Sequence, residues 1–157
     1  MSIFSELGIR EGKDREGEEF LYNLAMCYGL IEKEINTLLG QYDLSAVKMN
    51  ALLMIKHVGK DKGLSQNEIC KRMIVTPGNI TRLLDRLQKE GWVERLPSKS
   101  DRRVNLIRIT PKASTLLDKV WPSYRKKINE ICHLIPSTDR TQATQALHHL
   151  RLQLSQS

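Results

Sequence analysis

The sequence predicts a mainly α-helical protein with one small β-hairpin, and three observations support this class. Apolar residues recur at steps of three and four along most of the chain, which is the period of amphipathic helices. Aromatic residues make up only 5% of the 157 residues, and there are 9 Gly and 5 Pro, a composition that is thin for an all-β protein. Between residues 92 and 109 the hydrophobic period shortens to two, which predicts a pair of strands.

Two helices are predicted in the N-terminal part of the chain. The first covers residues 15–40, with glutamates near its start, where the helix dipole favours negative charge, and Gly40 as its stop. The second follows Ser45, a residue type whose hydroxyl oxygen caps helix N-termini. Residues 59–63 form a polar, glycine-bounded loop that ends this second helix.

The next two helices are short and closely spaced, as in a helix-turn-helix. Ser65 and Glu68 have the spacing of a capping box, in which each side chain accepts a hydrogen bond from the other residue's backbone N–H. A second helix starts at Thr76-Pro77, because threonine can cap and proline suits the first helical position. Gly91 ends this helix.

A hairpin and two longer helices complete the predicted order of elements. The strands are predicted at 92–96 and 104–109, and a polar loop joins them. Thr110-Pro111 repeats the threonine–proline helix start, and Pro122 inside the long helix that follows predicts a kink. A last helix is predicted after Pro136.

The net charge of +7 is concentrated in the middle of the chain. Residues 1–70 carry 8 Lys/Arg and 11 Asp/Glu, residues 71–112 carry 11 and 4, and residues 113–157 carry 6 and 3. The central segment therefore holds an excess equal to that of the whole chain. Such a concentration is more typical of a surface that binds an anionic partner, nucleic acid foremost, than of an ordinary solvated face.

The helix predicted after Pro77 has one apolar face and one basic face. Its apolar positions at i, i+3, i+4 and i+7 are Ile80, Leu83, Leu84 and Leu87. The opposite face carries Asn79, Arg82, Arg86 and Lys89. Asparagine can pair with adenine and arginine with guanine in the major groove, while threonine hydroxyls and first-turn N–H groups suit phosphates. The alternative is an amphipathic surface helix with ordinary exposed charges.

The loop between the strands has a matching charge pattern. Lys99, Arg102 and Arg103 lie at or near its tip, and arginine is attracted into a narrow minor groove by its negative potential. Asp101 would repel phosphate unless it paired with an arginine, so we expect it to orient Arg103. The alternative is a solvated loop with an incidental ion pair. Together, the helix-turn-helix and this wing predict the DNA-binding residues Ser65, Thr76, Pro77, Gly78, Asn79, Thr81, Arg82, Arg86, Lys99, Asp101, Arg102 and Arg103.

At these residues the sequence resembles the MarR (multiple antibiotic resistance regulator) family of bacterial transcription factors. The stretches that carry the resemblance are LSQNEI at 64–69, VTPGNITRLLDRL at 75–87, EGWVER at 90–95, DRR at 101–103 and ITPKA at 109–113. The Asp-x-Arg pattern in the wing and its distance to Thr-Pro-Lys are rather specific, and the order of the helices on both sides also fits.

The resemblance implies one MarR-like domain over residues 1–157 that forms an obligate homodimer. Residues 15–40 and 112–155 would form the dimerisation region, and residues 45–110 the winged DNA-binding lobe. The implied partner is double-stranded DNA with a pseudopalindromic operator, read by residues 76–89 in the major groove. Members of the family often act as repressors, and a small-molecule effector such as an aromatic acid, or oxidation of a thiol, commonly releases them from DNA.

We expect no enzyme, no cofactor and no metal site. The sequence has no phosphate-binding glycine loop, no HExxH and no CxxC motif. His148 and His149 are adjacent, so they point to different faces of a helix and do not share a metal by local spacing. With no secretory signal and no apolar run long enough to cross a membrane, we expect a cytoplasmic protein.

Two alternative functions stay open beside the DNA-binding regulator. The first is a winged-helix module for protein–protein contact, whose binding would depend little on salt, whereas DNA binding depends on it steeply. The second is a thiol-based oxidative-stress sensor that acts through Cys27. A small buried residue is the favoured interpretation of Cys27, and the change Cys27→Ser would abolish the response to oxidant only in a sensor.

Overall fold

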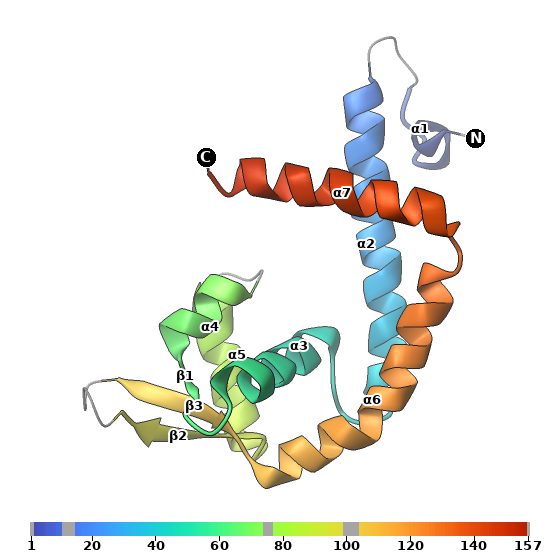
Figure 1. The fold of residues 1–157 in the computed structure, drawn as a ribbon. Coiled ribbons are helices and arrows are strands. Elements are labelled where there is room, and N and C mark those ends of the chain that lie inside the picture. The colour runs from blue at the N-terminus through green and yellow to red at the C-terminus, as the bar shows by residue number, and fades with distance from the viewer. Residues whose placement is uncertain (1, 11–14, 74–76, 99–103, 157) are drawn as a thin grey trace. The chain divides into compact units, whose positions relative to one another are not determined.

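The computed structural model describes residues 2–10, 15–73, 77–98 and 104–156. Most of its elements are helices, and it also contains a small antiparallel sheet, so the predicted fold class is confirmed (Figure 1). The chain divides into two compact units, residues 1–120 and 121–157, and the sixth helix contributes to both. In chain order the elements are α1 (Ile3–Glu6), α2 (Glu16–Gly40), α3 (Ala46–Met54), the π-helical turn η1 (Ile55–Gly59), β1 (Leu64–Ser65), α4 (Gln66–Arg72), α5 (Pro77–Lys89), β2 (Val93–Pro97), β3 (Asn105–Ile109), α6 (Pro111–Cys132) and α7 (Ser137–Leu154).

Hydrogen bonds at three helix starts confirm the caps predicted at Ser45, Ser65 and Thr110, while Thr76 lies outside the described residues. Ser45 caps α3 with its hydroxyl oxygen. At α4 the Ser65 hydroxyl oxygen accepts from the N–H of Glu68 at 3.3 Å, and the Glu68 carboxylate accepts from the N–H of Ser65 at 2.8 Å. At α6 the Thr110 hydroxyl oxygen accepts from the N–H of Ala113 at 3.3 Å. These bonds satisfy N–H groups that the first turn of a helix leaves without partners.

The sheet has three antiparallel strands in the order β1-β3-β2. The predicted hairpin is confirmed, because β2 and β3 pair along their length and Val93 lies opposite Ile109. The third strand, β1, was not predicted. It has only two residues, Leu64 and Ser65, and it pairs with β3 at Ile107 and Leu106. Two residues are too few to show a period in the sequence.

The apolar stripe predicted for α5 is the part of the helix that enters the core of the first unit. Ile80, Leu84 and Leu87 have no exposed surface, and Leu83 is half-buried. Neighbouring contacts come from α4 on one side and from β2 on the other (Figure 1). Because this stripe is enclosed, the rotation of α5 about its own axis is fixed, and so is the direction of its opposite face.

An N-terminal turn of helix, α1, was also not predicted. Its Ile3 and Phe4 are buried, and the Phe4 ring meets Tyr22 of α2 edge to face with 5.9 Å between ring centres. The Arg15 guanidinium lies 4.4 Å from the centre of the Phe4 ring and donates a hydrogen bond to the carbonyl oxygen of Arg10 at 2.7 Å. A four-residue helix has no stability of its own, so these tertiary contacts hold it.

Gly63 combines a left-handed backbone with a close approach to the sheet. Its φ is +77°, and a Cβ added there would lie 2.8 Å from the carbonyl oxygen of Ile107. We expect Gly63→Ala to lower the free energy of unfolding by about 2 kcal/mol or more, measured by denaturant titration. Gly91→Ala is the control, because Gly91 has φ +74° but open space around it, and it should cost only about 1 kcal/mol. Equal losses in the two variants would contradict the contact with Ile107.

The second unit consists of the C-terminal part of α6 and of α7. None of the residues of α7 is buried. Large apolar side chains are exposed on this unit, namely Trp121, Leu134, Ile135, Leu147, Leu152 and Leu154. Within the described ranges, no helix has the length and apolar character needed to cross a membrane.

Candidate nucleic-acid interface

The exposed face of α5 is the centre of the predicted interface. The buried stripe of Ile80, Leu84 and Leu87 turns the other side of the helix outward. Five of the predicted DNA-binding residues lie on this outward side with exposed positions: Gly78, Asn79, Thr81, Arg82 and Arg86. Lys89, in the last turn, is exposed as well. The structure thus brings together an amide, a hydroxyl and three cations on one helix face.

Arg82 and Arg86 have their guanidinium groups available to an external acceptor. Among the described parts of the chain, neither guanidinium group makes a hydrogen bond or an ion pair with another residue. A guanidinium carries five N–H donors in a planar fork that matches phosphate oxygens or a base edge. The two arginines are four residues apart, so they are neighbours on the helix surface. This arrangement can receive an acidic, planar or phosphate-bearing partner.

A hollow of about 350 Å³ lies where α3 meets this face. Its lining residues come from the start of α3 and from α5: Ser45, Val47, Lys48, Asn79, Arg82, Leu83 and Arg86. The two arginines therefore stand at a concave, cationic surface and not on an isolated helix. Such a surface raises the local concentration of anionic groups.

The helix-turn-helix is held together by a bond between its two helices. The side-chain amide of Gln66 in α4 donates to the hydroxyl oxygen of Thr81 in α5 at 2.8 Å. Gln66 and Ser65 also line a second hollow of about 310 Å³, next to Arg95 and Val104. Thr81 therefore contributes to the geometry of the motif besides its exposed position on the reading face.

Ser65 has a structural role that occupies its hydroxyl group. Besides accepting from the N–H of Glu68, the hydroxyl donates to the Glu68 carboxylate at 2.7 Å. These hydrogen bonds from the Ser65 hydroxyl and N–H hold the pKa of Glu68 below its usual value. The predicted contact of Ser65 with DNA stays a prediction, and the capping box is what the structure shows at this residue.

The lowered pKa of Glu68 makes the capping box pH-dependent. Its folded pKa lies below the unfolded value near 4.5, so the ionised carboxylate stabilises the fold above that value, and this stability is lost as pH falls through the folded pKa. We expect Glu68→Gln to lower the free energy of unfolding by roughly 0.5 kcal/mol at neutral pH. Denaturant titrations between about pH 7 and pH 3 should show the difference from wild type shrinking below about pH 4.5. A difference that stays constant over this range would contradict the assignment.

The sequence did not predict the bonds that join α5, the helix that carries the proposed DNA-reading face, to strand β2 of the wing. Arg95 of β2 donates to the Asp85 carboxylate at 2.5 Å and to the Gln88 side-chain oxygen at 2.8 Å. Both acceptors belong to α5, so this one arginine ties a wing strand to the reading helix. The available signal was an acid and a base on either side of the turn at Gly91, but ten residues of separation fit no local spacing rule.

Several predicted site residues lie outside the described residues. They are Thr76, Lys99, Asp101, Arg102 and Arg103. The expected contact of the wing with the minor groove and the pairing of Asp101 with Arg103 therefore stay predictions. Pro77 begins α5, as its residue type predicted.

Cys27 differs from the favoured expectation of a buried residue. In the chain on its own this cysteine is exposed on α2, whereas Cys70 and Cys132 are partly buried. The prediction of burial was wrong because the apolar stripe of α2 is enclosed only at its C-terminal end, at Ile35 and Leu39. Groups of three or more His, Cys, Asp or Glu side chains arranged for a metal do not occur within the described ranges.

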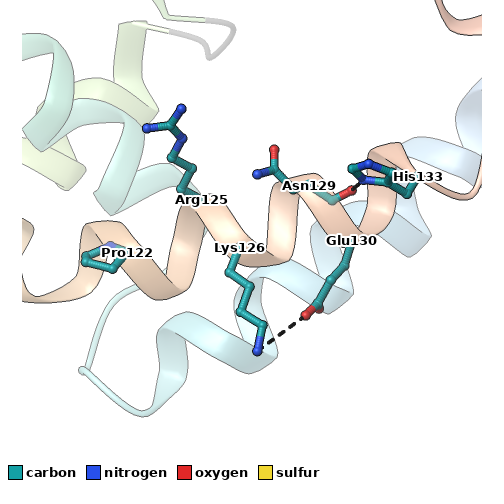
Figure 2. A pocket seen from close by; sticks show the side chains of 6 residues that line it. All are labelled: Pro122, Arg125, Lys126, Asn129, Glu130 and His133. Atoms are coloured by element: carbon teal, nitrogen blue, oxygen red, sulfur yellow. Dashed lines mark hydrogen bonds and ion pairs between the residues drawn. The ribbon is translucent and has the colours of Figure 1, made fainter. Parts of the chain in front are cut away.

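A larger hollow of about 510 Å³ lies along α6 in the second unit (Figure 2). Its lining residues run from Pro122 to Glu130 on that helix and end with His133, the residue directly after it. Lys126 is paired with Glu130 at 4.0 Å, and the His133 ring nitrogen lies 2.6 Å from the carbonyl oxygen of Asn129. Figure 2 shows Arg125 and Lys126 pointing to different sides of the helix. The hollow is therefore an open helix face and not a converging set of groups.

Comparison with known proteins places the interface in a family. Residues 42–104, which hold the helix-turn-helix and the first strand of the hairpin, match the sequence model of the MarR family. The multiple antibiotic resistance protein MarR of Salmonella typhimurium is 30% identical over 108 residues, which cover 69% of this chain and 65% of that protein. The transcriptional regulator MhqR of Bacillus subtilis is 26% identical over 133 residues, or 85% of this chain and 90% of that protein.

Solved structures share the fold. A variant of MarR from E. coli in complex with operator DNA has a TM-score of 0.80 at 22% identity, covering 89% of this chain and 99% of that one. A MarR-like regulator from Bacillus cereus has a TM-score of 0.76 at 22% identity, covering 88% and 97%. The matched segment, the relatives and the shared fold agree with the resemblance seen in the sequence, and the chain belongs to the MarR family.

Proposed function

We propose that this protein is a sequence-specific DNA-binding transcriptional regulator that acts as a homodimer and as a repressor responsive to a small molecule. The observation that carries the proposal is the fixed outward face of α5, where Arg82 and Arg86 are exposed and have no partner among the described residues. This function needs no catalytic group and no cofactor. Because its partner is genomic DNA, we place its action in the bacterial cytoplasm.

The reading mechanism follows from the chemistry of this face. Asn79, Arg82 and Arg86 would enter the major groove, where each base pair shows a distinct pattern of donors and acceptors. Gly78, Thr81 and the N–H groups of the first turn of α5 would contact phosphates and set the register. The wing, with Lys99, Arg102 and Arg103, would add contacts in the adjacent minor groove.

The homodimer is supported by apolar surface that the first unit leaves uncovered. The stripe of α2 is buried at Ile35 and Leu39, but toward the N-terminus it is exposed at Phe20, Leu21, Tyr28 and Ile31. Contiguous apolar surface on a helix marks an interface more often than a solvated face. A second copy of the chain would cover this stripe, and two-fold symmetry would present two copies of α5 to the two halves of an operator.

An effector would act by favouring one of two arrangements of the dimer. DNA binding requires a particular distance between the two copies of α5 in the dimer. A ligand that binds more tightly to a dimer with another distance therefore lowers the affinity for DNA, by the ratio of its affinities for the two arrangements. A phenol or an aromatic acid is the class we propose. Support comes from a structural neighbour, an organohalide-sensing regulator solved in its 2,4-dichlorophenol-bound form, which has a TM-score of 0.81 at 18% identity.

The salt dependence of binding tests this function against the protein-interaction alternative. Neutralising several phosphates releases counterions, so affinity for a selected duplex should fall at least about 100-fold between about 50 and 200 mM salt. Fluorescence anisotropy with a labelled duplex measures this slope. Affinity that barely changes with salt, or the absence of binding at low salt, would contradict the proposal.

One observation favours a second way of regulating the same protein. Cys27 is exposed on α2, so an oxidant can reach its thiol in the single chain. If the thiol is the sensor, oxidant will release DNA from wild type but not from Cys27→Ser. If a ligand alone regulates the protein, the two will respond alike.

A further inference from the structure

The C-terminal end of α5 is joined to the starts of α3 and α6 by a cluster of four residues, which we call the Glu90 cluster (Lys48, Glu90, Trp92 and Lys112). The Lys48 ammonium donates to both carboxylate oxygens of Glu90, at 2.7 and 2.8 Å. The Trp92 indole N–H donates to the same carboxylate at 2.9 Å. Lys112 lies 4.8 Å from the centre of the Trp92 ring and donates to the Glu90 carbonyl oxygen at 3.3 Å.

The residues of the Glu90 cluster lie where the end of α5 meets the starts of two other helices. Glu90 directly follows α5, and its N–H donates to the carbonyl oxygen of Arg86 at 2.9 Å. Lys48 belongs to the first turn of α3, and Lys112 to the first turn of α6. The end of the helix that carries the exposed arginines is thus fastened to the starts of two other helices.

The pair at the centre of the cluster is sheltered from water. The side chain of Lys48 is 13% exposed and that of Glu90 is 32% exposed. Lys48 also donates to the carbonyl oxygen of Asp43 at 3.3 Å, so its ammonium has several acceptors. A pair with this shielding and these additional bonds interacts more strongly than one on an open surface, and the loss of one partner leaves the other poorly compensated.

Lys48 connects this cluster to the interface. It lines the hollow of about 350 Å³ together with Asn79, Arg82 and Arg86. The contact between Lys48 and Glu90 therefore fixes the position of the C-terminal end of α5 relative to the start of α3. These two elements form the walls of the hollow, so their relative position determines the shape of the cationic surface.

We propose that Glu90 is a positioning residue for DNA reading, which holds the end of α5 through Lys48 and Trp92 without touching DNA. The inference rests on the proposed DNA-binding function. Its effect has a sign that a simple charge effect cannot imitate. Glu90 is an anion in a cationic region, so if it acted only through its charge, Glu90→Gln would strengthen binding to phosphate. If it acts by positioning, the same change weakens binding.

The test compares Glu90→Gln with Asp118→Asn by anisotropy titration of one selected duplex at two salt concentrations. Asp118 is the matched control because it pairs with Lys56 at 2.6 Å and its loss removes the same charge away from α5. We expect Glu90→Gln to raise the Kd about tenfold with the salt slope unchanged, while Asp118→Asn stays within about twofold of wild type. Lys48→Met should also raise the Kd. The Kd of the double variant Glu90→Gln/Lys48→Met should not exceed the higher of the two single-variant values, because both changes break the same contact.

Two measurements separate positioning from loss of folding. Circular dichroism reports whether each variant is folded, and the indole N–H resonance of Trp92 should move in Glu90→Gln because its acceptor changes. If Glu90→Gln does not fold, Trp92→Phe, which removes one donor to Glu90 and keeps the ion pair, should weaken binding in the same direction.

The outcomes are distinct. A folded Glu90→Gln that binds as well as or better than wild type overturns the positioning role, and so does an equal loss in Asp118→Asn. With an unfolded Glu90→Gln, unchanged binding by Trp92→Phe overturns it too. If wild type itself binds no duplex at low salt, the proposed function fails and not only this inference.

Discussion

The single variants Arg82→Ala and Arg86→Ala are each expected to raise the Kd for a selected duplex by roughly 10- to 100-fold. We expect no other single substitution in the interface to have a larger effect. Both guanidinium groups are exposed on the outward face of α5 and have no partner among the described residues, so their loss disturbs no internal bond. Stability should therefore stay close to wild type while affinity falls. Anisotropy titration and denaturant unfolding of the same samples measure the two quantities.

The control for this loss is Arg125→Ala, which removes the same charge from an exposed position on α6. It should change the Kd by no more than about twofold, because Arg125 is not one of the predicted DNA-binding residues and its charge is screened by salt. Titrating each variant against duplexes with single base changes then shows whether each arginine contacts a base or a phosphate. Loss of preference at one base pair assigns base reading, and uniform loss with a smaller salt slope assigns phosphate contact. If Arg125→Ala weakened binding as much as Arg82→Ala, the α5 face would not be the reading surface.

Leu21→Glu is expected to dissociate the homodimer and, through it, to weaken DNA binding. Leu21 lies in the uncovered part of the α2 stripe with 58% of its surface exposed in the single chain. Burying a carboxylate in an apolar interface costs several kcal/mol, so the dimer dissociation constant should rise at least about 100-fold. Sedimentation equilibrium measures the shift to single chains, and anisotropy measures the accompanying loss of affinity.

Asn23→Glu is the matched control for this change. Asn23 is exposed on the same helix outside the apolar stripe, and its side-chain amide donates to the carbonyl oxygen of Glu19 at 2.9 Å. It gains the same charge without placing that charge in the proposed interface, so the chain should remain a dimer. Dissociation by both variants, or by neither, would contradict the assignment of the α2 stripe to the interface.

Much of the fold could be predicted because its signals are local. The caps at Ser45, Ser65 and Thr110 follow from residue type and spacing, and each makes the expected bond. The outward face of α5 follows from its apolar stripe, since Ile80, Leu84 and Leu87 could be buried only with Arg82 and Arg86 outside. These predictions needed no knowledge of distant contacts.

What could not be predicted depends on contacts between residues far apart in the chain. The strand β1 exists because Leu64 meets Ile107, and α1 persists because Phe4 packs against Tyr22. The pairs of Arg95 with Asp85 and of Lys48 with Glu90 join elements whose approach no local pattern describes. The exposure of Cys27 was missed for the same reason, because periodicity shows an apolar stripe but not how much of it one chain can cover.

In the proposed homodimer, two copies of α5 stand at a fixed spacing that matches the helical repeat of DNA. The most direct measurement is the affinity for a selected pseudopalindromic duplex before and after about five base pairs, half a helical turn, are inserted between its halves. The insertion turns the two half-sites to opposite faces of the duplex. We expect the affinity to fall at least about 100-fold, because a dimer bound at one half-site can then no longer reach the other. Equal affinity for the two duplexes would contradict it.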